Sequence, residues 1–144
     1  LVDVRFNKKN FMEIGNIYAK RDWGFAKDYV EAMWKMLQKK TPEDYVICTG
    51  NTITVKDFIN LFLKKLNFKF KWTGKGLNEK AINLDNKKII IKISRKFFRP
   101  AEVDYLKGSY LKAKKILKWK PKTKIDELVK IMVDAEIEIK KHYL

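Results

Sequence analysis

The stretch NIYAKRDWGFAKDYVEAMW, residues 16–34, places charged residues directly before a helix-like run. In that run and just after it, apolar residues recur at intervals of three and four, which predicts a helix with one apolar face. Arg21 would lie near the start of this helix, where free backbone N–H groups and the helix dipole favour negative charge. It is therefore a candidate anion ligand, unless it simply pairs with Asp22 or Asp28. The predicted apolar face carries Phe25, Tyr29, Val30, Met33, Trp34 and Leu37.

The rest of the chain alternates between strand-like and helix-like runs. We expect strands at residues 11–17, 44–50, 68–72 and 88–93, with a polar loop at 73–86. We expect helices from Gly24 to Lys40, from Thr52 or Thr54 to Leu66, over residues 109–117, and from Ile125 to about His142. This pattern predicts a single α/β domain, residues 1–144, with a small mixed sheet and packed helices. It lacks the regular strand–helix rhythm of a complete doubly wound domain.

Composition excludes several classes of protein. With 46% hydrophobic residues the 144-residue chain can form a core, and it is not a disordered sequence. No apolar run approaches the roughly 20 residues that span a bilayer, so we expect no membrane partner. One cysteine, Cys48, and one histidine, His142, supply neither a disulfide framework nor a zinc site. We therefore expect no metal and a reducing, cytoplasmic location.

The net charge of +16 raises the possibility of a nucleic-acid partner. Specific base reading relies mostly on arginine, whereas this chain has 33 basic residues of which only four are arginine. Its lysines are scattered along every segment instead of clustered. A basic nucleic-acid-binding module is therefore an alternative that the sequence does not favour. The four arginines are Arg5, Arg21, Arg95 and Arg99.

Motifs for catalysis are weak. Gly74 and Gly76 form a close glycine pair, but no third glycine and no predicted helix follow them, as a dinucleotide-binding turn would require. Tyr110 and Lys114 have the Tyr-x-x-x-Lys spacing of short-chain dehydrogenases. In a chain so rich in lysine about one such match is expected by chance, so we interpret it as one. We predict no catalytic residue in this chain.

A second candidate binding segment is FRPAEVD, residues 98–104. Pro100 would bias Arg99 toward an extended conformation and so pre-orient its guanidinium. Glu102, three residues later, could accept hydrogen bonds from the hydroxyl groups of a ligand. A planar arginine fork suits phosphate and a carboxylate suits a diol, so this pair is typical of a site for a nucleoside diphosphate.

Three segments together closely resemble the C-terminal part of the GDP-mannose 4,6-dehydratases, which belong to the extended short-chain dehydrogenases. They are GNIYAKRDWGFAKDYVEAMWKMLQ, FFRPAEVDYLKG and AKKILKWKPKTKIDELVKIMV. The resemblance extends from Phe11 to about Lys140 and weakens at residues 1–10 and 73–86. It implies that the fold is the C-terminal substrate-binding portion of such an enzyme, without the complete Rossmann domain.

The resemblance also implies roles for individual residues. Arg21 and Arg99 would hold the phosphates of a GDP-sugar, and Glu102 would bind the ribose hydroxyls. Those enzymes are NADP-dependent lyases that convert GDP-mannose to GDP-4-keto-6-deoxymannose. Their NADP loop, catalytic Thr and Glu, and Tyr-x-x-x-Lys pair precede this part and are not in this chain. We therefore expect the chain alone to be inactive; an alternative is a non-catalytic GDP-sugar-binding remnant or subunit.

By the same resemblance, residues 44–50 would form a strand that joins a nucleotide-binding sheet absent from this chain. The helix face with Met33, Trp34 and Leu37 would then be uncovered. Uncovered apolar faces and strand edges promote association. We therefore expect a homo-oligomer, or contact with a separate N-terminal nucleotide-binding half.

Overall fold

A computed structural model describes residues 1–99 and 101–141. Pro100, expected to stiffen the loop after Arg99, and His142, the expected end of the last helix, lie outside the described residues. The helices are α1 (Val2–Arg5), α2 (Ala26–Leu37), α3 (Val55–Lys65), α4 (Leu111–Ile116) and α5 (Ile125–Lys141), with 3₁₀ turns η1 (Gly76–Asn78) and η2 (Arg95–Phe97). The strands are β1 (Met12–Ile14), β2 (Lys20–Asp22), β3 (Thr52–Thr54), β4 (Phe70–Thr73), β5 (Lys80–Asn83) and β6 (Ile89–Ile93).

The main sheet has four strands in the order β1-β6-β5-β4. β1 runs parallel to β6, whereas β5 pairs antiparallel with both β6 and β4. A second sheet of two strands joins β2 and β3 in antiparallel register, with Arg21 opposite Ile53. The structure thus confirms the predicted α/β class with a small mixed sheet and packed helices.

Strand β5 corrects the expectation of a polar loop at residues 73–86. The sequence Lys80–Asn83 is too short and too polar to predict a strand by itself. It becomes one because β4 and β6 supply hydrogen-bonding partners on both sides. Its small central residue, Ala81, is completely buried in the core.

The expected strand at residues 44–50 is also wrong for this structure, since the segment forms no strand. A strand needs a neighbour to satisfy its backbone groups, and no described strand forms ladder pairs with this segment. Cys48 within it is buried, and Tyr45 and Ile47 pack against the cluster around Trp119. That these residues join a sheet outside the chain stays a prediction.

β1 is shorter than the predicted strand at 11–17 because the chain comes close to another segment at Gly15. A Cβ atom there would lie 2.2 Å from the carbonyl oxygen of Phe97, so only glycine fits. The Ser94 N–H donates to the carbonyl of Ile14 at 2.8 Å, which seats the turn η2 against the end of β1. This contact brings residues 95–99 beside residues 14–16.

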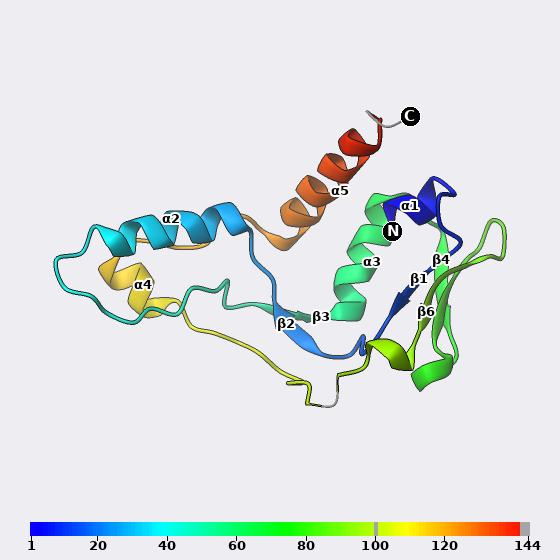
Figure 1. Cartoon of the computed structure of the whole chain (residues 1–144), viewed down its shortest axis with the longest axis horizontal. Coiled ribbons are helices and arrows are strands. Elements are labelled where there is room, and N and C mark those ends of the chain that lie inside the picture. Colours follow the sequence, from blue (N-terminus) through cyan, green and yellow to red (C-terminus); the bar gives the residue numbers. More distant parts are fainter. Residues whose placement is uncertain (100, 142–144) are drawn as a thin grey trace.

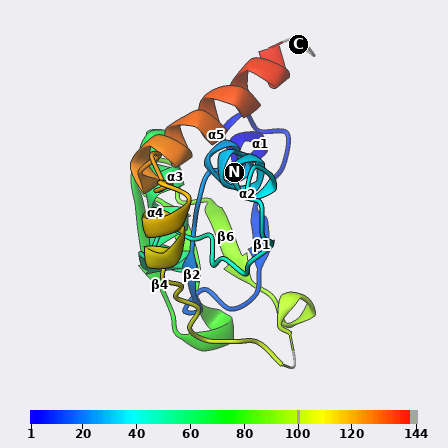
Figure 2. The ribbon, with the colours of Figure 1, turned by 90° about the vertical axis from the view of Figure 1, so that its left-hand side faces the viewer.

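The main core lies between the sheet and α3, whose apolar face is the one predicted. Thr54 caps α3, as its Oγ1 accepts the Asp57 N–H at 3.0 Å. α5 packs on the other side of α3 through Val129 and Val133. The core against the sheet contains Ile17, Ile59, Leu63, Ala81, Ile90, Ile91 and Ile93. In Figure 1 and Figure 2, α5 projects beyond the rest of the molecule.

Helices α2 and α4 lie together, apart from α3 and the main sheet, and long connections lead to them (Figure 1). A small cluster of Ala32, Ala113, Leu117 and Trp119 joins them. The opposite face of α2 is uncovered in this chain, as expected. Its exposed fractions are 59% for Val30, 56% for Met33, 61% for Trp34 and 82% for Leu37.

Across residues 1–99 and 101–141, no helix is both long enough and apolar enough to cross a bilayer.

Candidate functional site

Arg21, Arg99 and Glu102 line one pocket of about 510 Å³, which we call the arginine pocket. It lies where β1 and β6 end, beside β2. The three residues come from segments far apart in the sequence, and the structure brings them together. Other charged or aromatic side chains in its lining are Glu13, Trp23, Lys96, Phe97 and Phe98.

Arg21 is directed by two contacts made by its guanidinium. One Nη donates to the carbonyl of Lys20 at 2.8 Å, and the other donates to Glu102 Oε1 at 2.9 Å. The Arg21 and Glu102 side chains are 23% and 21% exposed, so this ion pair is partly shielded from water. Two groups predicted to bind one ligand are therefore already adjacent to each other.

The alternative that Arg21 pairs with Asp22 or Asp28 is wrong, because both aspartates hold backbone segments in place. Asp22 accepts the backbone N–H groups of Thr49 and Gly50, each at 2.8 Å, and the Thr49 hydroxyl at 2.6 Å. It thereby fixes the segment before β3 against β2. Sequence reasoning missed this contact because Asp22 and Thr49 are 27 residues apart in the sequence.

Asp28 clamps a second connection, the one that leads into α5. Its Oδ2 accepts the backbone N–H groups of Lys122 and Thr123 at 2.9 and 2.8 Å, and its carbonyl accepts the Trp119 indole N–H at 2.9 Å. Burial alone would raise the pKa of Asp28, but the N–H donors from Thr123 and Lys122 outweigh this and lower it. An acidic residue in the first turn of a helix is visible in the sequence, but it does not identify the segment that it contacts.

Glu102 reaches Arg21 because its loop is attached to the edge of β2. The Lys20 N–H donates to the carbonyl of Asp104 at 2.7 Å, and the Leu106 N–H donates to the carbonyl of Lys20 at 3.3 Å. The loop thus pairs with the edge of β2 through one isolated bridge, between Lys20 and Tyr105. The position of Glu102 follows from backbone pairing as well as from its own ion pair.

Arg99 is exposed at the border of the same pocket. Among the described residues no carboxylate forms an ion pair with it, so its guanidinium is available to an anion. Lys96 in the same lining adds positive charge, with its ammonium 5.9 Å from the centre of the Phe97 ring. Arg21, Lys96 and Arg99 give this pocket a cationic side that suits phosphate.

A second polar cluster surrounds Glu79, which directly precedes β5 and is only 3% exposed. Tyr18 donates its hydroxyl to Glu79 at 2.5 Å, and Lys56 donates at 2.6 Å. Burial would raise the pKa of Glu79, but the hydrogen bonds from Lys56 and Tyr18 outweigh it and lower the pKa. This cluster joins the start of β5, α3 and the chain after β1, and no sequence pattern predicts it.

Neither dehydrogenase-like motif forms a cofactor site among the described residues. Gly74 and Gly76 have positive φ, and Gly76 begins the 3₁₀ turn η1, which leads into β5, so they present no α-helix N-terminus to a pyrophosphate. These residues do not fit a dinucleotide. Tyr110 packs edge-on against Trp119, with ring centres 6.1 Å apart, and Lys114 is exposed. No group of three acidic, histidine or cysteine side chains in residues 1–99 and 101–141 could hold a metal.

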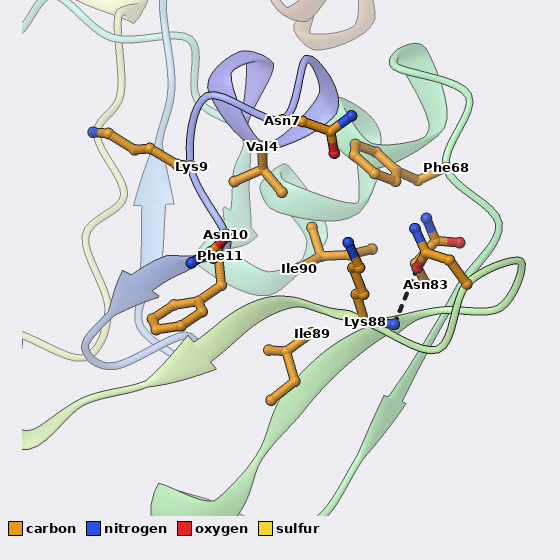
Figure 3. Close-up of a pocket in the computed structure, with 11 residues that line it drawn as sticks. Val4, Asn7, Lys9, Asn10, Phe11, Phe68, Asn83, Lys88, Ile89 and Ile90 are labelled. Atoms are coloured by element: carbon orange, nitrogen blue, oxygen red, sulfur yellow. Dashed lines mark hydrogen bonds between the residues drawn. The ribbon is translucent and has the colours of Figure 1, made fainter.

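A separate hollow of about 610 Å³ lies where β1 and β6 begin (Figure 3). Its lining is rich in side-chain amides and includes Lys9 and Lys88. Asn83 and Asn86 accept the backbone N–H groups of Asp85 and Lys88 at 2.9 and 3.0 Å. Turn geometry accounts for these two amides, and none of the predicted site residues lies here.

Comparison with known proteins places the chain in a family. The family described as "GDP-mannose 4,6 dehydratase" matches residues 1–132. The GDP-mannose 4,6 dehydratase of Dictyostelium discoideum is 47% identical over 135 residues, which are 94% of this chain and 38% of that protein. The human enzyme of the same name is 46% identical over 126 residues, covering 88% of this chain and 34% of that protein.

Solved structures with the same fold include nucleotide-sugar enzymes. A UDP-glucose 4-epimerase from Thermotoga maritima with UDP-glucose aligns with a TM-score of 0.69 and 21% identity, over 95% of this chain and 38% of that one. The structure of RMD from Pseudomonas aeruginosa complexed with NADPH aligns with a TM-score of 0.64 and 19% identity, over 88% of this chain and 36% of that one. The chain thus spans less than two fifths of the length of these four proteins. With a family match over residues 1–132, the chain belongs to the GDP-mannose 4,6-dehydratase family.

Proposed function

We propose that the chain supplies the GDP-sugar-binding part of a GDP-mannose 4,6-dehydratase. The observation that carries the proposal is that Arg21, Arg99 and Glu102 line one pocket although they lie far apart in the sequence. Arg21 and Arg99 bind the diphosphate from two sides, and Glu102 accepts hydrogen bonds from the ribose hydroxyls. The family match supports a GDP-sugar as the ligand.

The first prediction tests the phosphate-binding role. Arg99→Lys keeps the charge but removes the planar fork, so it should weaken GDP binding about tenfold, the equivalent of one charge-assisted hydrogen bond. Calorimetry, or ligand-observed NMR for weak binding, measures the dissociation constant. Arg5→Lys is the matched control, because Arg5 lies outside the pocket, near the Phe68 ring. Unchanged GDP binding in the Arg99 variant would remove the basis of the proposal.

The dehydratase reaction requires parts that the described residues do not provide. In our proposal the NADP site and the catalytic groups come from a separate nucleotide-binding half, and the isolated chain is catalytically inactive. The second prediction follows: purified chain incubated with GDP-mannose and NADP yields no 4-keto-6-deoxy product above background. Product formation by this chain alone would contradict us. The single cysteine is a buried free thiol, which accords with a reducing cytoplasmic compartment.

A further inference from the structure

The hollow drawn in Figure 3 lies at the opposite end of β1 and β6 from the arginine pocket, and the proposed function does not use it. We call it the amide hollow. Its volume of about 610 Å³ is in the range of sites that hold small molecules. The described residues that line it include four asparagines and two lysines, but no aspartate or glutamate. This lining suits a ligand that is anionic and rich in hydrogen-bonding groups.

Lys88 supplies the positive charge of the amide hollow. The turn between β5 and β6 fixes its backbone, because its carbonyl accepts the Asn83 N–H at 2.9 Å and its own N–H donates to Asn86 Oδ1 at 3.0 Å. Its side chain extends into the hollow in Figure 3, and no carboxylate in the described part of the chain forms an ion pair with it. Lys9 instead points away from the hollow and lies 3.9 Å from the Asp3 carboxylate. The Lys88 ammonium is thus available to an anionic group.

The asparagines offer a ligand two kinds of hydrogen-bonding group. Asn83 and Asn86 use their Oδ1 atoms to accept backbone N–H groups of their own turn, so only their N–H donors remain. Donors next to the Lys88 ammonium suit the oxygens of a phosphate. The amides of Asn7 and Asn10 form no hydrogen bond with another described residue, so each keeps a donor and an acceptor. A hydroxyl group, which both donates and accepts, matches such an amide.

The inner wall of the amide hollow is apolar. Ile90 is 1% exposed, and Val4 and Phe68 pack against the core of the main sheet. Phe11 adds a second aromatic ring to the lining. The carbon skeleton of a ligand gains binding free energy by covering such a wall, whereas inorganic phosphate has no apolar atoms to place there.

We propose that the amide hollow is a binding site for a sugar monophosphate. The phosphate contacts Lys88 and the N–H donors of Asn83 and Asn86, the sugar hydroxyls bond to Asn7 and Asn10, and the carbon atoms of the sugar lie against the apolar wall. The hollow shares no lining residue with the arginine pocket, so this inference does not depend on the proposed function.

The test uses the whole 144-residue chain with glucose 6-phosphate and fructose 6-phosphate as probes, and with glucose and inorganic phosphate as partial ligands. NMR of the asparagine side-chain amides measures both the dissociation constant and the place of binding. Each sugar phosphate should shift the signals of the lining asparagines. It should bind about tenfold more tightly than either partial ligand, because each of these lacks one set of contacts. Saturating GDP should leave this binding unchanged.

Lys88→Gln should weaken the binding of both sugar phosphates about tenfold, since it removes the charge that faces the phosphate. Lys87→Gln is the matched control: it changes the net charge equally, but its ammonium donates to the Leu84 carbonyl at 2.8 Å and lies outside the lining. Asn7→Asp is a second variant that keeps the fold, because Asn7 has a φ of 58°, which aspartate also tolerates. Its added carboxylate should repel the phosphate and weaken binding by about tenfold or more.

The inference is overturned if neither sugar phosphate binds, if inorganic phosphate binds as tightly as they do, or if Lys87→Gln costs as much as Lys88→Gln. Displacement of the sugar phosphates by GDP would place them in the arginine pocket and would overturn it too. Binding of GDP itself tests the proposed function separately. A chain that binds sugar phosphates but not GDP would contradict the proposed function and leave this inference standing.

Discussion

Glu79 shows how one residue connects three segments. Its buried carboxylate receives Lys56 from α3 and Tyr18 from the chain after β1. Because these donors lower its pKa below the ordinary 4.5, the stabilisation is complete above that pH and is lost as the pH falls below it. Acid should therefore weaken the junction between α3 and the sheet.

The third prediction is that Glu79→Gln lowers the free energy of unfolding by about 2 kcal/mol at pH 7, since it leaves Lys56 without its anionic partner. Urea titration at pH 7 and at pH 4 measures it. The difference between variant and parent should shrink at the lower pH. Glu43→Gln, which removes an exposed pair with Lys112, is the control and should change little. A Glu79 variant as stable as the parent at pH 7 would show that the cluster contributes nothing.

For single residues, the sequence indicates which chemical groups are present but not which residues they contact. Residue type alone predicts that Arg99 could hold a phosphate and Glu102 a diol, and these roles stay predictions. That Arg21 pairs with Glu102, and that Asp22 and Asp28 do not pair with it, depends on which loops meet in space. Such contacts between distant segments leave no periodic signal in the sequence.

Among the elements, α3 carries its own start signal. Thr54 both accepts the Asp57 N–H and donates its hydroxyl to the Asp57 carboxylate, at 3.0 and 2.6 Å. The fourth prediction is that Thr54→Ala costs about 1 kcal/mol of stability, as a lost N-cap does. Thermal or urea unfolding measures the change. Thr52→Ala removes a threonine from the other end of β3 and should cost less; equal costs would mean that strand propensity, not capping, is responsible.

Helices were predicted more accurately than strands for a physical reason. The apolar face of α3 and the caps of its ends are local, so they are readable in the sequence. β5 is a strand because of β4 and β6, and residues 44–50 are not a strand because they have no neighbour. Strand identity depends on pairing that the local sequence does not specify.

At the scale of the whole molecule, the apolar face of α2 is a large exposed surface that lacks a packing partner among the described residues. The net charge of +16 opposes association at low salt, whereas screening at higher salt lets apolar contacts dominate. The fifth prediction is that the chain self-associates, more strongly as salt rises, and that Trp34→Lys reduces this. Sedimentation at several protein and salt concentrations measures it.

The control for that experiment is Leu111→Lys, which removes a side chain that is 69% exposed on α4 instead of α2. The Leu111→Lys variant should self-associate to the same extent as the parent chain. A parent chain that stays monomeric at high concentration, and does not bind a separately produced nucleotide-binding half, would contradict the expectation of a partner for α2.

The parallel pairing of β1 with β6 has a consequence for synthesis on the ribosome. Met12 is aligned with Ile91, so β1 leaves the ribosome long before β6, its neighbour in the described sheet, has been made. At about 5–20 residues per second, the roughly 80 residues between them take at least about 4 s to translate. β4, β5 and β6 instead follow one another and can pair as they emerge. During translation the edge of β1 that later pairs with β6 is therefore open to other chains.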